Sequence, residues 1–91
     1  MNYSLNYNEF VVRDDIPKLD KFFRGKIKEA VERKLAVDPV FYGKPLRNSL
    51  RGHRRFRIGK YRVIYRIEGE VVLILAIAKR AVVYKTVVGR V

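Results

Sequence analysis

The chain has 91 residues, enough for one domain and too few for two, and 48% of them are hydrophobic, which favours a folded core over disorder. It contains no cysteine, so disulfide bonds and thiolate chemistry are excluded. The formal net charge of +12 indicates an anionic partner.

The first predicted elements are a strand and a helical region. Residues 3–7 alternate in polarity and predict a short strand. The acidic pair Asp14-Asp15 comes just before a proline and predicts a helix start. Within residues 16–35 the apolar side chains recur at steps of three and four, which places them on one helical face. Asp20 or a neighbour is expected to divide this region into two helices, and Asp38-Pro39 to end it.

Strands dominate the rest of the chain. Residues 36–48 contain two prolines and one glycine and are expected to form a loop. Runs rich in β-branched and aromatic residues predict strands over Arg54–Ile58, Tyr61–Ile67 and Val71–Ala78. The tail from Lys79 to Val91 is compatible with either a last strand or a short helix. These elements predict a single α+β domain over residues 1–91.

Nothing in the sequence points to a membrane or to secretion. Met1 is followed by Asn2-Tyr3-Ser4 and not by a charged segment with an apolar run behind it. The longest apolar run, Val71–Ala78, is far too short to span a bilayer. We therefore expect a cytoplasmic protein without a membrane partner.

Positive charge is concentrated in the second half of the chain. Residues 1–45 carry nine Lys or Arg against seven Asp or Glu, whereas residues 46–91 carry twelve against two, and nine of those twelve are arginine. A planar guanidinium group pairs with phosphate and stacks on bases, so this bias favours nucleic acid. A thermophile-like charged surface would need acidic partners that this half lacks. An acidic protein and an anionic membrane surface are the other candidates.

A hairpin turn at Gly59-Lys60 would fix which side chains share a face of the sheet, because directly opposed residues lie on the same side. One face then collects Phe56, Ile58, Tyr61, Val63, Tyr65 and Ile67. The other collects Arg55, Arg57, Arg62, Ile64 and Arg66. A slip by one residue would bury arginine, so the predicted register is consistent with itself.

In this register Arg57 lies opposite Arg62, and like charges across a strand pair repel. No carboxylate occurs between Gly43 and Ile67 to compensate them. We interpret this face as a binding surface for a polyanion, the alternative being an exposed basic sheet whose side chains spread into water. Residues 71–78 are apolar on both faces and predict a central strand, whose second face is covered either by the tail or by a partner helix.

Several catalytic arrangements are not expected from the sequence. With no cysteine and one histidine, neither a metal site nor a Cys/His pair is predicted, and no glycine motif for a cofactor is present. Metal-free RNA cleavage remains open, in which a 2′-hydroxyl attacks the neighbouring phosphate and guanidinium groups stabilise the developing charge. Tyr84, Lys79 and His53 are the titratable candidates, although Tyr84 could equally be a packing residue and His53 a surface residue.

Short motifs follow one another in a recognisable order: Lys44-Pro45-Leu46, Leu50-Arg51-Gly52, the block from Arg55 to Arg66, Leu75-Ala76-Ile77, Lys79-Arg80 and Tyr84. With them the chain resembles the RelE/ParE superfamily of type II toxin–antitoxin toxins over nearly its whole length. The central block is fairly specific for the superfamily and less so for any one activity. The resemblance implies an N-terminal strand, a helical hairpin and a curved antiparallel sheet. It also implies a cognate antitoxin that wraps around the toxin.

RelE-type members enter the ribosomal A site and cut messenger RNA, so the resemblance implies a ribosome-dependent mRNA endonuclease without a cofactor. By position, the catalytic residues of the family fall on Arg57, Arg62, Arg80 and Tyr84. Further RNA contacts are expected from Arg54, Arg55, Arg66 and Lys79. The expected partners are the ribosome, mRNA and the antitoxin.

Two departures from the family leave other functions open. Arg57 stands where relatives carry a lysine proposed as general base, and Ala81-Val82-Val83 make the tail more apolar. The alternatives are a ParE-like toxin that inhibits DNA gyrase and a catalytically weak relative that binds RNA or the ribosome. Simple alternation from Val71 also places Arg80 on the face opposite Arg62, so a bend after Ala78 is expected to bring it back.

Overall fold

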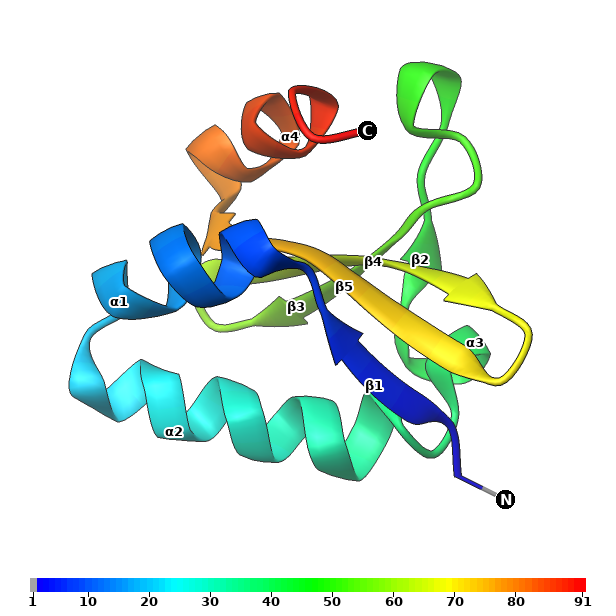
Figure 1. The fold of residues 1–91 in the computed structure, drawn as a ribbon, viewed down its shortest axis with the longest axis horizontal. Helices are drawn as coiled ribbons and strands as arrows, with labels where there is room; N and C mark the ends of the chain where they lie inside the picture. Colours follow the sequence, from blue (N-terminus) through cyan, green and yellow to red (C-terminus); the bar gives the residue numbers. More distant parts are fainter. Residues whose placement is uncertain (1) are drawn as a thin grey trace.

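The computed structural model describes residues 2–91 and contains a five-stranded sheet with helices on both faces (Figure 1). The strands are β1 Ser4–Tyr7, β2 Lys44–Pro45, β3 Arg54–Ile58, β4 Tyr61–Glu68 and β5 Val71–Lys79. The helical segments are the π-helical η1 Val11–Asp15, α1 Ile16–Lys18, α2 Lys21–Ala30, the π-helical η2 Val31–Leu35, α3 Pro39–Tyr42, the 3₁₀ turn η3 Asn48–Leu50 and α4 Arg80–Val88. The predicted α+β class is confirmed.

The order of strands in the sheet is β1-β5-β4-β3-β2. β1 runs parallel to β5, whereas the other neighbouring strands are antiparallel. The sheet is therefore mixed, whereas an antiparallel sheet was expected. The difference arises because β1 is followed by helices. No tight hairpin forces an antiparallel partner on it. No helix within residues 2–91 has both the length and the apolar composition needed to span a bilayer.

Two of the predicted helix boundaries are confirmed. Asp20 separates α1 from α2 and caps α2, since its Oδ1 accepts a hydrogen bond from the Phe23 N–H at 3.0 Å. The helical region ends at Leu35 in η2, as expected ahead of Asp38. Asp38 in turn caps the short helix α3 by accepting from the Phe41 N–H at 3.1 Å. The predicted loop over residues 36–48 therefore contains α3 and β2.

The helix start expected at Asp14-Asp15 is wrong. Helical backbone already begins at residue 9, where the Asn8 Oδ1 accepts the Phe10 N–H at 2.8 Å. Asp15 consequently lies inside the helical run, and it is buried. An aspartate ahead of a proline has the pattern of a cap, and the sequence does not reveal that this one has a buried partner far along the chain.

The predicted register of the β3–β4 hairpin is confirmed, with Arg57 opposite Arg62 and Ile58 opposite Tyr61. The apolar face of these strands packs against the helices, as does the predicted helical face. The buried members of this core are Val11, Leu19, Ile27, Val31, Leu35, Phe56, Ile58, Tyr61, Val63, Tyr65, Val72, Ile74 and Ile77, with Ile16, Phe23, Ala30 and Ile67 packed against them.

The second face of the sheet is covered by the tail of the chain, which forms α4. Figure 1 shows α2 and α4 on opposite sides of the sheet. The buried residues between α4 and the sheet, including those of α4 itself, are Leu50, Ile64, Leu75, Ala76, Val83 and Val87. Of the two alternatives for residues 79–91, the helix is therefore correct, and the tail supplies the cover that a partner could have supplied.

A β-bulge in β5 changes the face that the end of this strand presents. Ile74 pairs with Tyr65, but Ala76 pairs with Ile64, so Leu75 is an extra residue without a partner in the ladder. The alternation of side chains is thereby reset, and residues beyond the bulge point to the opposite face from the one that simple alternation predicts. The reversal expected after Ala78 takes place earlier in the strand.

A buried ion pair joins the two ends of the chain next to this bulge. The Arg90 guanidinium donates to both carboxylate oxygens of Asp15, at 2.7 and 2.8 Å, and the two side chains are only 11% and 7% exposed. Arg90 also donates to the Leu75 carbonyl, while Asp15 accepts the Ile77 N–H, both at 2.9 Å. Because β1 ends opposite Ile74, this pair satisfies backbone groups of β5 that lie beyond the end of β1.

Tyr65 links the sheet to α3, and its titration is open to measurement. Its buried hydroxyl donates to the Pro39 carbonyl, and burial raises the pKa of Tyr65 above 10.0. The folded state therefore favours the neutral phenol: stability is unaffected well below pH 10 and falls as the pH rises past that value. In urea unfolding at a series of alkaline pH values, we expect Tyr65→Phe to lose less stability with pH than wild type. Identical slopes would contradict the assignment.

Candidate functional site

A basic hollow of about 380 Å³ opens where β2, β3 and β4 meet the start of α4. Its lining residues are Tyr42, Lys44, Arg55, Phe56, Arg57, Arg62 and Arg80. We call this hollow the arginine cleft. Four residues that the sequence singles out, Arg55, Arg57, Arg62 and Arg80, thus meet in one place.

The strand register and the bulge together assemble this cleft. Arg57 lies directly across from Arg62, and Arg55 follows on the same face of β3 because side chains alternate along a strand. The bulge in β5 turns Arg80 to this face. Tyr84 lies four residues beyond Arg80 in α4 and therefore on the same side of that helix.

Arg62 is half-buried and has the other charges of the cleft around it. Burial lowers the pKa of Arg62 from its ordinary value, and the other three arginines lower it further, while Tyr84 acts in the opposite direction. Its Nη1 donates only to the main-chain carbonyls of Gly59 and Tyr61, at 3.2 and 3.1 Å. Within residues 2–91 none of the four arginines of the cleft forms a salt bridge. The cleft is therefore a concentration of positive charge without an internal counter-charge.

Two of the predicted RNA contacts already have partners within the chain. Arg54 lies on the face of the sheet that α2 covers, where its Nη2 donates to the carbonyls of Val40 at 2.8 Å and Gly43 at 3.0 Å. Arg66 lies on the face of the cleft but forms a salt bridge with Glu68 at 2.6 Å. Because these guanidinium groups are engaged, we leave both residues out of the proposed RNA surface.

Two of the predicted titratable candidates also lie away from the cleft. Lys79 opposes Tyr61 on the other face of the sheet and lines a different hollow. His53 is 7% exposed, with its Nδ1 3.2 Å from the Leu50 carbonyl, so the predicted surface position is wrong. The reason is a tight turn, in which the His53 N–H donates to the same carbonyl at 3.0 Å and turns the ring inward. Tyr84 is the candidate that remains near enough for its charge to act on Arg62, although it packs against the buried residues under α4 and does not itself line the cleft.

Sequence reasoning missed Tyr42 and Lys44 as residues of the cleft. Both lie in the stretch predicted to be a loop, at the end of α3 and in β2. Lys44 reaches the cleft because it pairs with Arg55 in the sheet. The signal that could have found them is the adjacent aromatic pair Phe41-Tyr42 followed closely by Lys44.

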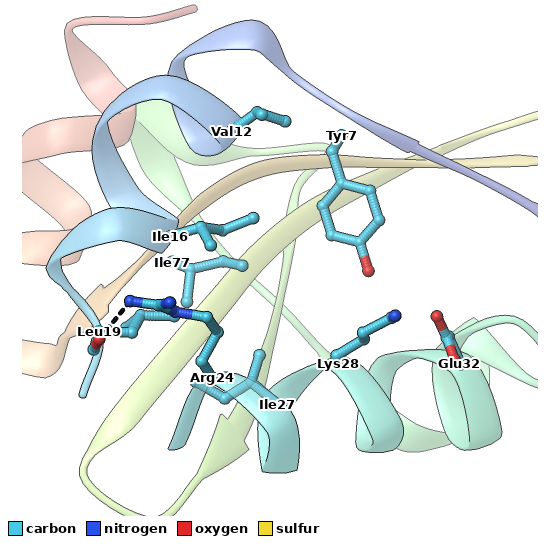
Figure 2. A pocket seen from close by; sticks show the side chains of 9 residues that line it. All are labelled: Tyr7, Val12, Ile16, Leu19, Arg24, Ile27, Lys28, Glu32 and Ile77. Carbon is cyan, nitrogen blue, oxygen red and sulfur yellow. Dashed lines mark hydrogen bonds between the residues drawn. The ribbon is translucent and has the colours of Figure 1, made fainter. Parts of the chain in front are cut away.

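A second hollow, of about 280 Å³, lies between β1, η1, α1, α2 and β5 (Figure 2). Its walls are mostly apolar, and Figure 2 shows the ring of Tyr7 reaching from β1 toward α2. The Arg24 guanidinium donates to the Leu19 carbonyl at 3.1 Å at one end. None of the predicted site residues lines this hollow, which lies on the face of the sheet that α2 covers. Across residues 2–91, no group of three His, Asp or Glu side chains is arranged to hold a metal ion.

The fold that carries this cleft is found in solved toxin–antitoxin structures. A chain of the toxin–antitoxin complex RelBE2 from Mycobacterium tuberculosis is similar over 89% of this chain and 94% of that one, with a TM-score of 0.81 and 34% identity. A mutant of the E. coli toxin RelE in the free state matches 100% of this chain and 99% of that one, with a TM-score of 0.70 and 22% identity. The second likeness concerns the fold alone. Together they define the class as toxins with the RelE fold.

Sequence comparison gives the family. The family described as "ParE toxin of type II toxin-antitoxin system, parDE" matches residues 8–84. Toxin RelG of Mycobacterium tuberculosis is 34% identical over 87 residues, which is 93% of this chain and 99% of RelG. The chain therefore belongs to the RelE/ParE family of type II toxin–antitoxin toxins, as the motifs of its sequence predict.

Proposed function

We propose that this toxin cleaves messenger RNA on the ribosome and so inhibits translation. The observation that supports the proposal is the convergence of Arg55, Arg57, Arg62 and Arg80 in one cleft beside Tyr84, without an internal carboxylate. Guanidinium groups held this close repel one another, and a phosphodiester backbone supplies the charge that relieves the repulsion. Because its phosphates offset the repulsion between the arginines, RNA is a suitable ligand for the cleft.

The proposed reaction is attack of a ribose 2′-hydroxyl on the adjacent phosphorus, with the 5′-oxygen of the next nucleotide as leaving group. The arginines stabilise the extra negative charge that develops on the phosphate oxygens. One proton must leave the attacking hydroxyl and another must reach the leaving oxygen. Arginine side chains remain protonated, so Arg57 acts as a cation at a position where relatives carry a lysine. The Tyr84 phenol, next to Arg62, is then assigned to proton transfer.

The proposal places the toxin in the cytoplasm, where its partners would be the ribosome, mRNA and an antitoxin. The complexes solved for RelBE2 and for E. coli RelBE contain an antitoxin. A cleft with this charge fits an acidic antitoxin segment as well as it fits RNA. If a tight complex with the product of a neighbouring gene is never recovered on co-purification, the antitoxin part of the proposal is wrong.

A translation extract tests the activity. Cleavage of ribosome-bound message by the wild-type toxin supports the proposal. Intact message together with blocked supercoiling by DNA gyrase would instead select the ParE-like alternative. Binding to ribosomes without cleavage would select the catalytically weak relative, the alternative that Arg57 and the apolar segment at residues 81–83 leave open.

The Arg57–Arg62 pair allows stability and binding to be separated. Arg57→Glu replaces a cross-strand repulsion by an attraction, so we expect the free energy of unfolding to rise by about 0.2–1 kcal/mol while RNA binding is lost. Thermal unfolding and a binding titration with a short single-stranded RNA measure the two effects. If Arg57→Glu is less stable than wild type, or binds RNA as tightly, the Arg57–Arg62 pair is not a site where two repelling arginines bind RNA.

A further inference from the structure

Beside the arginine cleft, α3 exposes two aromatic side chains that no packing role explains. Phe41 is 76% exposed and Tyr42 is 40% exposed, and their rings contact one another edge to face, with 5.0 Å between centroids. A single exposed aromatic side chain is ordinary on a protein surface. Here two of them are adjacent, and Tyr42 is itself part of the lining of the cleft. The aromatic surface and the cationic surface are therefore continuous.

The sheet holds this aromatic pair in a fixed position. Arg54 donates to the carbonyls on either side of the pair, those of Val40 and Gly43. The Tyr65 hydroxyl donates to the Pro39 carbonyl at the start of α3. Gly43 lies so close to the same hydroxyl that a Cβ atom there would overlap it. A four-residue helix anchored in these ways loses little conformational freedom when a ligand binds.

Charge determines the kind of ligand that suits this surface. The Lys34 ammonium lies 5.7 Å from the centroid of the Tyr42 ring, and Lys44 and the four arginines continue the positive charge into the cleft. Aromatic rings embedded in positive charge are the arrangement that binds single-stranded nucleic acid, since phosphates meet the cations while bases stack on the rings. An apolar partner helix would leave these cations without counter-charges.

We propose that Phe41 and Tyr42 form a stacking surface for a nucleobase that flanks the phosphate held in the arginine cleft. This inference rests on the proposed function and adds a base-recognition element to it. Arg54, which was expected to contact RNA, acts instead as a positioning residue that fixes the backbone on both sides of the aromatic pair.

The chain contains no tryptophan, so a single introduced tryptophan reports on stacking without background. Tyr42→Trp is titrated with a short single-stranded RNA made uncleavable by 2′-O-methylation, and we expect its fluorescence to be quenched. Phe22→Trp is the matched control, because Phe22 is 68% exposed, lies on α2 and does not line the cleft. Its emission is expected to stay unchanged. An abasic oligonucleotide of equal length tests whether the base is needed, since it should bind through its phosphates and leave Tyr42→Trp unquenched.

Affinity measurements separate stacking from phosphate binding. We expect Tyr42→Ala to weaken RNA binding by about 5- to 100-fold without changing its dependence on salt, and Tyr42→Phe to restore the affinity. Arg57→Ala should instead reduce the slope of log affinity against log salt by about one.

RNA binding that depends on Arg57 but not on Tyr42, with no quenching, would overturn the stacking surface and leave the proposed function intact. Failure of wild type to bind RNA would overturn both. Quenching by an acidic peptide but not by RNA would overturn the stacking surface in favour of a protein-binding role.

Discussion

Replacing Arg62 by alanine is expected to slow cleavage of ribosome-bound message by about 100- to 1000-fold. Arg62 is the half-buried member of the central Arg57–Arg62 pair, and the charges of the other cleft arginines act on it together with Tyr84. A guanidinium group held in place at a partly buried site stabilises developing phosphate charge with little reorganisation as the reaction proceeds. The effect should appear in the rate of cleavage under single-turnover conditions and to a smaller extent in ribosome binding.

The control for this prediction is Arg33→Ala. Arg33 is also a surface arginine, but it lies on η2, outside the cleft. It forms a salt bridge with Glu29 at 3.6 Å, and both side chains are highly exposed. Its loss should leave the cleavage rate unchanged. Thermal unfolding of Arg62→Ala should show little change in stability, because the substitution removes a cross-strand repulsion along with two hydrogen bonds to main-chain carbonyls. A cleavage rate within about twofold of wild type would refute the assignment of Arg62 to the reaction.

Replacing Arg90 by alanine is expected to lower the free energy of unfolding by about 3–5 kcal/mol. The substitution leaves the Asp15 carboxylate buried without its counter-charge and deprives the Leu75 carbonyl of its donor. Breaking a buried pair costs more than the pair contributes, because the remaining charge cannot return to water. For a domain of this size such a loss is a large share of the total stability. Urea unfolding followed by circular dichroism measures it.

An exposed arginine–aspartate pair close by serves as the control. Arg13 and Asp14 are 3.2 Å apart, but both side chains are largely open to water. Arg13→Ala should therefore leave the unfolding curve almost unchanged, since solvent screens such pairs. If Arg13→Ala and Arg90→Ala lowered the free energy of unfolding equally, the buried Asp15–Arg90 pair would not have the stabilising role proposed for it.

The parts of the fold set by local patterns could be predicted from the sequence. The hairpin register followed from the alternation of arginine with apolar residues, and it located Arg55, Arg57 and Arg62 on one face. The division of the helical region at Asp20 and its end ahead of Asp38-Pro39 could be predicted for the same reason, since aspartate and proline are local signals of helix boundaries.

Features that depend on distant contacts could not be predicted. The bulge at Leu75 has no local signature, so alternation placed Arg80 on the wrong face until the structure showed the reset. Asp15 looked like a helix cap because its partner, Arg90, is 75 residues away. Arg54 carried the same charge as its neighbours, and only the position of α3 shows that its guanidinium group is bound to the backbone there.

The contact between Asp15 and Arg90 also bears on the arginine cleft. Arg90 closely follows α4, and α4 begins with Arg80, which lines the cleft. The ion pair therefore ties the helix that carries Arg80 to a segment 75 residues earlier in the chain. We expect a substitution that breaks this pair to loosen α4 and, with it, the position of Arg80.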